Sequence, residues 1–277
     1  ESESGSRGRK GAAEIAEWSA VVGRAADLVP GGAQAVAEIV DDGGIPAGVF
    51  NLVMGRGSVV GEAMVGAPDV NAISFTGSVP TGRRIALACA ESGKKLQMEM
   101  GGKNPMVVLD DADLDTAVTS AVNGAFFSTG QRCTASSRLI VTEGIHDRFV
   151  DAVVARLKGL VVDDALKEGT HIGPVVDAAQ MEQDERYLAI GRDEDGANLA
   201  FGGERLNRET PGFYLQPALF TEATNTMRPP REAIFGPIAS PIRSHAHQAP
   251  RALSTATPFR PSPTLAPATP PPSTPLT

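Results

Sequence analysis

Continuous apolar runs and amphipathic stretches alternate along residues 21–240, and glycine-rich turns separate them. The helical spacing of apolar positions predicts helices over 33–44, 58–66, 81–93, 115–127 and 145–162. Short apolar runs predict a buried strand over 48–55 and further strands over 70–78, 94–100, the start of 104–115, and 137–144. Strand–helix alternation of this kind predicts an α/β fold with βαβ units and a mostly parallel sheet. Ligands of such sheets bind at the carboxyl ends of the strands.

Both ends of the chain differ in composition from this central part. From residue 241 onward Pro, Ser, Thr and Ala dominate, and Phe259 is the one aromatic residue. Such a segment buries too little apolar area to offset the entropy of ordering, so we expect 241–277 to be a disordered Pro-rich tail. The chain begins with the polar stretch ESESGSRGRKG, and we expect residues 1–20 to be poorly ordered.

Composition and charge narrow the class of protein. The chain has 277 residues, a net charge of −8 and 42% hydrophobic residues, as globular proteins do. We expect no nucleic-acid partner, because no stripe of Lys and Arg is present, and no membrane span, because no apolar run is long enough. Two cysteines cannot form a disulfide framework, which favours a reducing, cytoplasmic location. Four scattered histidines without Cys/His spacing predict no metal site.

A glycine-containing turn in SFTGSVPTGRRI (74–85) is the first candidate for chemistry. Gly77 and Gly82 flank the junction of a predicted strand and helix, and Ser78 supplies a hydroxyl there. Main-chain N–H groups and the partial positive charge at a helix start bind anions such as a nucleotide phosphate. An ordinary strand–helix turn would look the same. A second glycine-rich stretch, MGRGSVVGE (54–62), matches the dinucleotide fingerprint weakly because its third glycine is one position late.

Glu99 and Cys133 are the candidate catalytic groups. Glu99 lies at the end of an apolar strand, two residues before a glycine pair, where a carboxylate of raised pKa acts as a general base; the alternative is a surface Glu. Cys133 lies among small and polar residues, in FFSTGQRCTASSR (126–138), which leave room for a substrate carbonyl and offer main-chain N–H groups to an oxyanion. The alternative is a structural cysteine. Cys89 lies on the apolar face of a predicted helix, and we interpret it as a core residue.

Together these segments resemble the NAD(P)-dependent aldehyde dehydrogenase superfamily over roughly residues 21–240. MEMGGKNP and FFSTGQRCTAS resemble the glutamate and cysteine signatures of that family, and the interval 133 − 99 = 34 is the usual one. FTGSVPTG resembles the coenzyme phosphate segment, and IFGP (234–237) resembles the segment at the nicotinamide ribose. Several stretches are most similar in sequence to the α-ketoglutaric semialdehyde dehydrogenase branch, whose product is 2-oxoglutarate. They include GIPAGVFNLVMGRGSVVGEAM and GFYLQPALFTEATN.

The resemblance implies a fold, a reaction and a set of site residues. Residues 21–106 would form a partial doubly wound coenzyme-binding domain, and residues 107–240 a partial α/β catalytic domain that carries the cysteine. Cys133 would attack a small aldehyde and pass through a thioester, and Glu99 would activate the hydrolytic water. The implied coenzyme-site residues are Arg24, Asp27, Phe75, Gly77, Ser78, Gly82, Met100 and Phe235. Asp27 favours NAD over NADP, because a carboxylate accepts from a ribose hydroxyl.

The chain also departs from the family pattern. Arg24-Ala25 replaces a usual Lys-Pro, and Ala233 replaces a usual ribose-binding Glu, with Glu232 one residue early. The similarity starts late, without the PWNFP-like segment and its oxyanion-hole Asn, and it fades after Pro237. We therefore expect a truncated protein with uncovered sheet edges and poor solubility, and without the strand that makes family dimers or tetramers. The change of composition near residue 241 suggests a change of reading frame.

Three functions fit these observations. The first is an aldehyde dehydrogenase. The second is a catalytically dead fragment or pseudoenzyme that retains binding of a nucleotide or of a full-length homologue. The third is a thiol hydrolase that uses Cys133 without a coenzyme, and it ranks last because no histidine accompanies Cys133 locally.

Overall fold

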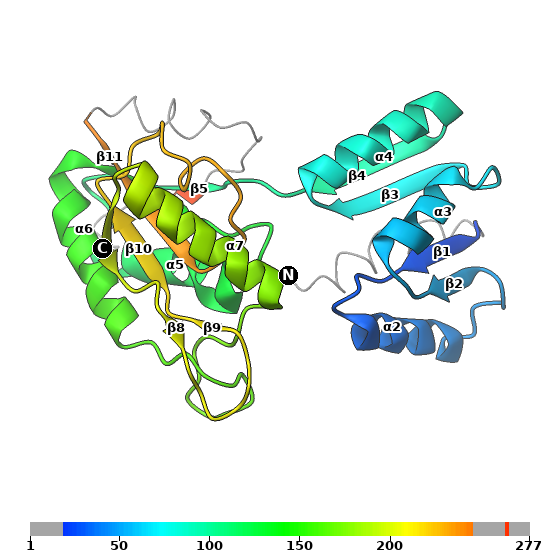
Figure 1. The fold of residues 1–277 in the computed structure, drawn as a ribbon, viewed down its shortest axis with the longest axis horizontal. Coiled ribbons are helices and arrows are strands. Elements are labelled where there is room, and N and C mark those ends of the chain that lie inside the picture. Colours follow the sequence, from blue (N-terminus) through cyan, green and yellow to red (C-terminus); the bar gives the residue numbers. More distant parts are fainter. Residues whose placement is uncertain (1–18, 246–263, 266–277) are drawn as a thin grey trace, which may run out of the picture. The chain divides into compact units, whose positions relative to one another are not determined.

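The computed structural model describes residues 19–245 and the pair Thr264–Leu265. The chain divides into two compact units, Glu1–Met100 and Gly101–Thr277, and each is described here by itself. Both units are α/β, as predicted (Figure 1). The expected boundary lay after residue 106, whereas the observed division lies after Met100, because Pro105 and Met106 begin a strand of the second unit's sheet.

Among its described residues, 19–100, the first unit contains two pairs of parallel strands and three α-helices. Its elements are β1 (Val21–Arg24), α2 (Pro30–Asp42), β2 (Phe50–Val53), a π-helical turn (Gly57–Gly61), α3 (Glu62–Gly66), β3 (Ala72–Gly77), α4 (Val79–Ser92) and β4 (Lys95–Met100). β1 pairs with β2, and β3 pairs with β4. Ser78 caps α4 by accepting from the main-chain N–H of Thr81, and Gly93 ends α4 in the left-handed conformation.

This first unit has little core. Among residues 19–100 only Ala25, Gly82 and Cys89 are buried, which confirms Cys89 as a core residue. The expectation of a buried strand over 48–55 is wrong, because no residue of β2 is buried. Its apolar side chains have too few neighbours within the described chain to be covered on both faces.

The second unit is built on one sheet of six strands in the order β12-β5-β6-β11-β10-β7. Its elements are β5 (Pro105–Val108), α5 (Leu114–Ala125), a 3₁₀ turn (Phe127–Gly130), β6 (Arg138–Thr142), α6 (Glu143–Lys158), α7 (Ala178–Ala189), a π-helical turn (Ile190–Glu194), β7 (Asn198–Phe201), β8 (Arg205–Leu206), β9 (Tyr214–Leu215), β10 (Ala218–Thr221), β11 (Ile238–Ser244) and β12 (Thr264–Leu265). β5, β6, β10, β11 and β12 run parallel, and β7 pairs antiparallel with β10.

Helices cover both faces of this sheet. Leu219 and Ala239 pack with α5 and α6 in one apolar cluster, whereas the neighbouring Ala218 and Ile238 pack with α7 in another. Successive residues of a strand point to opposite faces, so the two clusters lie on the two sides of the sheet. α7 and α5 are drawn on opposite sides of β10 and β11 in Figure 1.

The expectation that residues 241–277 are disordered is wrong at its start. Residues 241–244 complete β11 between β6 and β10, and Arg243 pairs with Glu143 (2.8 Å) and Asp147 (2.6 Å) of α6. Pro241 is tolerated in this central strand because of the direction in which its nitrogen points. Ser240 N donates to Ser137 O on the β6 side, so the nitrogen of Pro241 points to the β10 side. There β10 pairs only with Ile238 and Ala239 of β11, so no ladder hydrogen bond from residue 241 is lost. Thr264–Leu265 also pairs with β5. The rest of the expected tail, and residues 1–18, lie outside the described residues.

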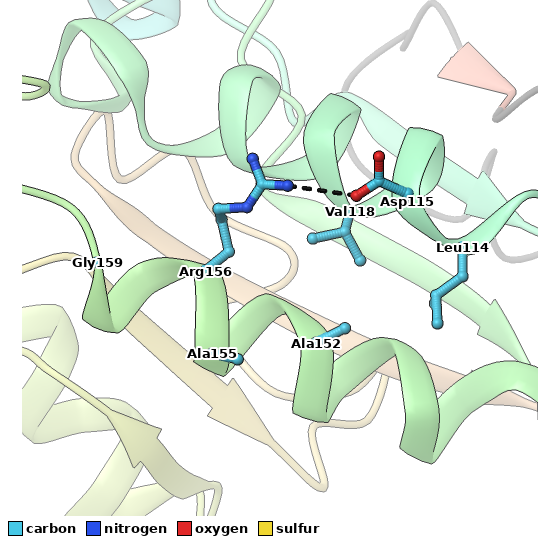
Figure 2. A pocket seen from close by; sticks show the side chains of 7 residues that line it. All are labelled: Leu114, Asp115, Val118, Ala152, Ala155, Arg156 and Gly159. Carbon is cyan, nitrogen blue, oxygen red and sulfur yellow. Dashed lines mark hydrogen bonds and ion pairs between the residues drawn. The ribbon is translucent and has the colours of Figure 1, made fainter.

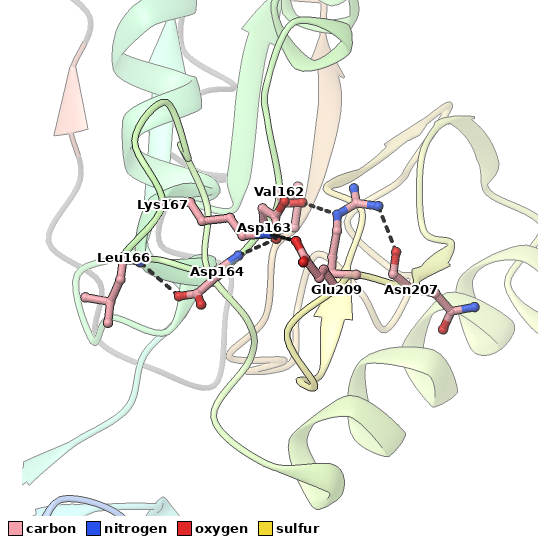
Figure 3. A network of polar contacts seen from close by, with 8 residues as sticks. Val162, Asp163, Asp164, Leu166, Lys167, Asn207 and Glu209 are labelled. Atoms are coloured by element: carbon pink, nitrogen blue, oxygen red, sulfur yellow. Dashed lines mark hydrogen bonds and ion pairs between the residues drawn. The ribbon is translucent and has the colours of Figure 1, made fainter.

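A polar network fixes the loop between α6 and α7 (Figure 3). Lys167 Nζ lies 3.4 Å from Asp163 and 3.3 Å from Glu209, which brings the loop to the segment between β8 and β9. From the same segment, Arg208 Nε donates to Val162 O (2.5 Å). These contacts join the loop after α6 to the segment between β8 and β9.

Candidate functional site

The carboxyl ends of β3 and β4 bring several predicted residues together in the first unit. The parallel register places Thr76 opposite Glu99 and Gly77 opposite Met100. A Cβ at Gly82 would lie 2.6 Å from Met100 Sδ, so the first turn of α4 rests directly on the end of β4. The structure therefore gathers Phe75, Gly77, Ser78, Gly82, Glu99 and Met100 at one end of this strand pair.

The turn from β3 into α4 has the features of an anion site. Ser78 is exposed, and its Oγ lies 3.0 Å from Thr81 Oγ1, so that two hydroxyls flank the start of a 14-residue helix. The N–H of Thr81 is 3.5 Å from Ser78 Oγ, a long contact that a stronger acceptor would replace. The residues present therefore fit a nucleotide phosphate.

Arg24 and Asp27 form a pair with each other. Arg24 Nη2 donates a hydrogen bond to Asp27 Oδ1, and Arg24 Nε donates to Gly55 O (2.9 Å). Arg24 thereby connects the end of β1 to the glycine-rich stretch after β2. The Asp27 carboxylate, which we expected to accept from a ribose, accepts from this guanidinium.

In the second unit, Cys133 lies exposed on the loop between the 3₁₀ turn and β6. Asn104 Nδ2 donates to Cys133 O (2.7 Å), and Ser136 N donates to Gly124 O (3.0 Å). The loop is therefore held on both sides of the cysteine, and the thiol remains accessible. Among the described residues, none accepts a hydrogen bond from the Cys133 N–H, which leaves this donor available to an oxyanion.

The turn before the cysteine has an unusual backbone. Ser128 and Thr129 have positive φ angles of 55° and 54°, and Gly130 follows at 64°. Gln131 Oε1 accepts from Thr129 Oγ1 (2.7 Å) and from Val176 N (3.2 Å), which ties this turn to the residue before the α7 cap. Non-glycine residues at positive φ persist only where their surroundings hold them, so the loop is a constrained structure.

Phe235 lies on a segment that contacts this turn. A Cβ at Gly130 would lie 2.2 Å from Gly236 O, so the two main chains touch and no other residue fits at 130. The Phe235 side chain is 46% exposed and its φ is 62°. The structure thus places the predicted nicotinamide residue beside the predicted nucleophile's loop. Glu232, which we expected one residue out of place for a ribose, accepts from Tyr187 Oη (2.6 Å).

Several side chains that the sequence analysis missed support these two segments. Lys103 is buried directly before Asn104, and burial together with the charge of Arg138 lowers the pKa of Lys103 to about 7, although Glu232 acts in the opposite sense. Gln180, Gln183 and Asp184 of α7 contact the segment around Phe235. Asp184 had a visible signal, because it shares the buried face of α7 with Met181 and Leu188 at helical spacing.

The predicted residues thus fall into two groups. Glu99 and the coenzyme-site residues other than Phe235 belong to the first unit, and Cys133 and Phe235 belong to the second. A separate groove of about 520 Å³ lies between α5 and α6, lined by Leu114, Asp115, Val118, Ala152, Ala155, Arg156 and Gly159 (Figure 2). Arg156 pairs with Asp115 across it (3.3 Å), and it contains none of the predicted site residues.

Two further features concern the described residues only. Within residues 19–245 no group of three or more His, Cys, Asp or Glu side chains is arranged to hold a metal ion. None of the helices in the same range is long and apolar enough to cross a membrane.

Comparison with known proteins gives consistent matches. The sequence model of the aldehyde dehydrogenase family matches residues 7–253. The chain is 45% identical to the alpha-ketoglutaric semialdehyde dehydrogenase of Bacillus subtilis over 205 residues, which cover 73% of this chain and 42% of that protein. It is 42% identical over 231 residues to the betaine aldehyde dehydrogenase of Rhizobium etli, and these residues cover 83% of this chain and 47% of that protein.

Solved structures agree with these matches. The betaine aldehyde dehydrogenase of Staphylococcus aureus in complex with NAD⁺ superposes with a TM-score of 0.84 at 32% identity, covering 86% of this chain and 48% of that one. An NAD-dependent aldehyde dehydrogenase from Sinorhizobium meliloti superposes with a TM-score of 0.87 at 35% identity, covering 92% and 51%. The chain therefore spans about half the length of the relatives that it matches.

Proposed function

Because the chain belongs to the aldehyde dehydrogenase family, we propose that it contributes to the NAD-dependent oxidation of an aldehyde to a carboxylic acid, with Cys133 as the nucleophile. The observation that carries this proposal is the exposed thiol on a loop held by Asn104 and by the turn at 128–130. A nucleophile in this setting is accessible to substrate while its main chain stays fixed. The substrate is a small aldehyde.

The reaction assigns a role to each group. The Cys133 thiolate attacks the aldehyde carbon, and its main-chain N–H stabilises the oxyanion that forms. NAD⁺, when bound, would accept the hydride that the aldehyde carbon loses as this adduct becomes a thioester. Glu99 takes a proton from the water that hydrolyses the thioester and releases the acid. Ser78, Thr81 and the start of α4 would hold the coenzyme phosphate, and Phe235 would contact the nicotinamide end.

For the substrate we favour 2-oxoglutarate semialdehyde. The support is the 45% identity to a protein named alpha-ketoglutaric semialdehyde dehydrogenase, together with the stretches quoted from the sequence. Relatives named betaine aldehyde dehydrogenase are 42% identical, so betaine aldehyde is the second candidate. NAD is favoured over NADP by the NAD⁺ in the complexes of the structural relatives. The free, unpaired cysteines suit the reducing cytoplasm.

The test is NADH formation by the purified chain with NAD and each aldehyde, with Cys133→Ala as the control. We expect Cys133-dependent NADH formation, faster with 2-oxoglutarate semialdehyde than with betaine aldehyde. Equal rates for the chain and the Cys133→Ala variant would remove the catalytic proposal. NAD binding that survives in that case would indicate a pseudoenzyme of the same family.

A further inference from the structure

Three side chains of α7 contact the segment that contains Phe235. Gln180 Nε2 donates both to Ile234 O (3.0 Å) and to Asp184 Oδ1 (2.8 Å), and Gln183 Nε2 donates to Ile234 O (2.6 Å). Two amides thus hold one main-chain carbonyl, immediately before Phe235. One of these amides also orients the Asp184 carboxyl.

Asp184 fixes the other side of Phe235. Its side chain is fully buried, and a Cβ at Gly236 would lie 2.0 Å from Asp184 Oδ1. Asp184 Oδ2 has no hydrogen-bond partner among the described residues. Burial raises the pKa of Asp184 to about 7, although the bond from Gln180 acts in the opposite sense, so the carboxyl is largely protonated in mildly acidic solution. A neutral carboxyl is the form that such a site tolerates.

Gly236 passes this contact on to the cysteine loop. The Gly236 carbonyl oxygen lies 2.2 Å from the position that a Cβ of Gly130 would take. Gly130 is three residues before Cys133. Asp184, Gly236 and Gly130 therefore form one line of van der Waals contact from α7 to the nucleophile's loop. A side chain at either glycine would clash with the next group in this line.

The conformation of Phe235 needs such support. A φ of 62° is strained for an aromatic residue, and Phe235 is 46% exposed and so gains little from packing. The strain persists because both neighbours are held: Ile234 by the two glutamines and Gly236 by Asp184 and Gly130.

We propose that Asp184 is a positioning residue: in its neutral form it holds the Ile234–Gly236 turn in the conformation that presents Phe235 and immobilises the cysteine loop. This proposal depends on the proposed function in one respect only, namely that the coenzyme in contact with Phe235 is NAD. Ionisation of Asp184 would place an uncompensated charge against Gly236 and loosen both segments.

Several charged side chains lie in the sequence near Asp184 and near Ile234, which precedes Phe235. α7 carries Glu182, Glu185 and Arg186, and Arg231 and Glu232 precede Ile234. The Glu185 charge raises the pKa of Asp184, although less than burial does, and Glu185 is itself paired with Arg205 of β8 (2.9 Å). Glu232 is engaged by Tyr187.

The test is amide hydrogen exchange of the full chain, read by mass spectrometry peptide by peptide and corrected for intrinsic exchange rates. The variants are Asp184→Asn, which keeps the shape without the charge, and Asp184→Ala, which removes the contact. Glu182→Gln is the matched control, because Glu182 is an exposed carboxylate of the same helix. Each is compared at about pH 6 and about pH 8.

For Asp184→Ala we expect exchange to rise by about tenfold or more in peptides covering 126–136 and 230–238, but not in β5 or β6. The wild-type chain and Glu182→Gln should both loosen in the same two peptides between about pH 6 and about pH 8, whereas Asp184→Asn should stay protected at both pH values. No rise with Asp184→Ala, or an equal rise throughout the second unit, would overturn the proposal. The readout needs no turnover, so a chain without NADH formation leaves this inference intact and counts only against the proposed function.

Discussion

The two cysteines differ most clearly at the scale of single residues. Cys89 is 1% exposed on α4, whereas Cys133 is exposed on its loop. The sequence already indicated this contrast, because Cys89 sits at apolar helical spacing and Cys133 among small polar residues. The contact of Asn104 with Cys133 could not be predicted, since it depends on how two segments 29 residues apart meet.

The rates at which the two thiols react test this difference in exposure. In native buffer we expect Cys133 to react with a thiol reagent at least about tenfold faster than Cys89, because alkylation requires exposure. The rates are measured by peptide mass spectrometry, and Cys133→Ala shows which signal belongs to which thiol. Equal rates for the two cysteines in the native chain would be inconsistent with the structure.

Asp184 predicts a specific pH dependence of stability. Because its pKa is raised to about 7 in the fold, from 3.8, the folded chain binds the proton more tightly than the unfolded chain does. The contribution of Asp184 is therefore fully present below about pH 4 and is lost as the pH rises through about 7. Asp184→Asn should make the second unit more stable than wild type at about pH 8, by an amount on the order of 4 kcal/mol, with a difference that shrinks toward about pH 4.

Denaturant unfolding at several pH values measures this difference, with Glu182→Gln as the control that should follow wild type. Stability curves of Asp184→Asn and wild type that run parallel with pH would show that Asp184 does not titrate as described.

At the scale of elements, the sequence predicted most helices and strands up to residue 162, and the structure contains them with shifted ends. β11 was missed because Pro241 and its polar neighbours resemble a linker. Only the pairing partners show that Pro241 lies beyond the two residues of β11, Ile238 and Ala239, that pair with β10. α7 was missed because its apolar stripe contains Asp184.

The cap of α7 offers a test at this scale. Asp177 Oδ1 accepts from Gln180 N (2.8 Å), and the helix that it caps carries Gln180, Gln183 and Asp184. Asp177→Ala should lower the free energy of unfolding by about 1 kcal/mol, because a first-turn N–H loses its acceptor. Asp177→Asn preserves a capping oxygen and should be close to neutral in the same urea titration. A neutral Asp177→Ala would show that the cap contributes nothing.

At the scale of the whole molecule, the two units differ in how much core they have. The second unit buries both faces of a sheet, whereas only three described residues of the first unit are buried. Large apolar side chains of the first unit remain exposed, among them Ile39 (69%), Val59 (66%) and Leu87 (63%). Composition could not show this difference, because both halves of the sequence are similarly apolar and coverage depends on which segments lie nearby.

This difference predicts unequal protection of amides. We expect β1, β2, β3 and β4 to exchange markedly faster than β5, β6 and β11, because few apolar contacts oppose their opening. Hydrogen exchange of the intact chain measures it, with intrinsic rates as the reference. Comparable protection in the two sets of strands would mean that the first unit is stabilised by contacts that its described residues do not make.

We propose that Cys133 forms a thioester and that Glu99 helps to hydrolyse it. The most direct measurement is mass spectrometry of the acid-quenched Glu99→Gln variant after mixing with NAD and 2-oxoglutarate semialdehyde, because slow hydrolysis should let the acyl-enzyme accumulate. We predict an acyl adduct on the peptide containing Cys133, formed only when NAD is present and absent from the Cys133→Ala chain. An adduct-free Cys133, or an adduct that forms equally well without NAD, would contradict the account.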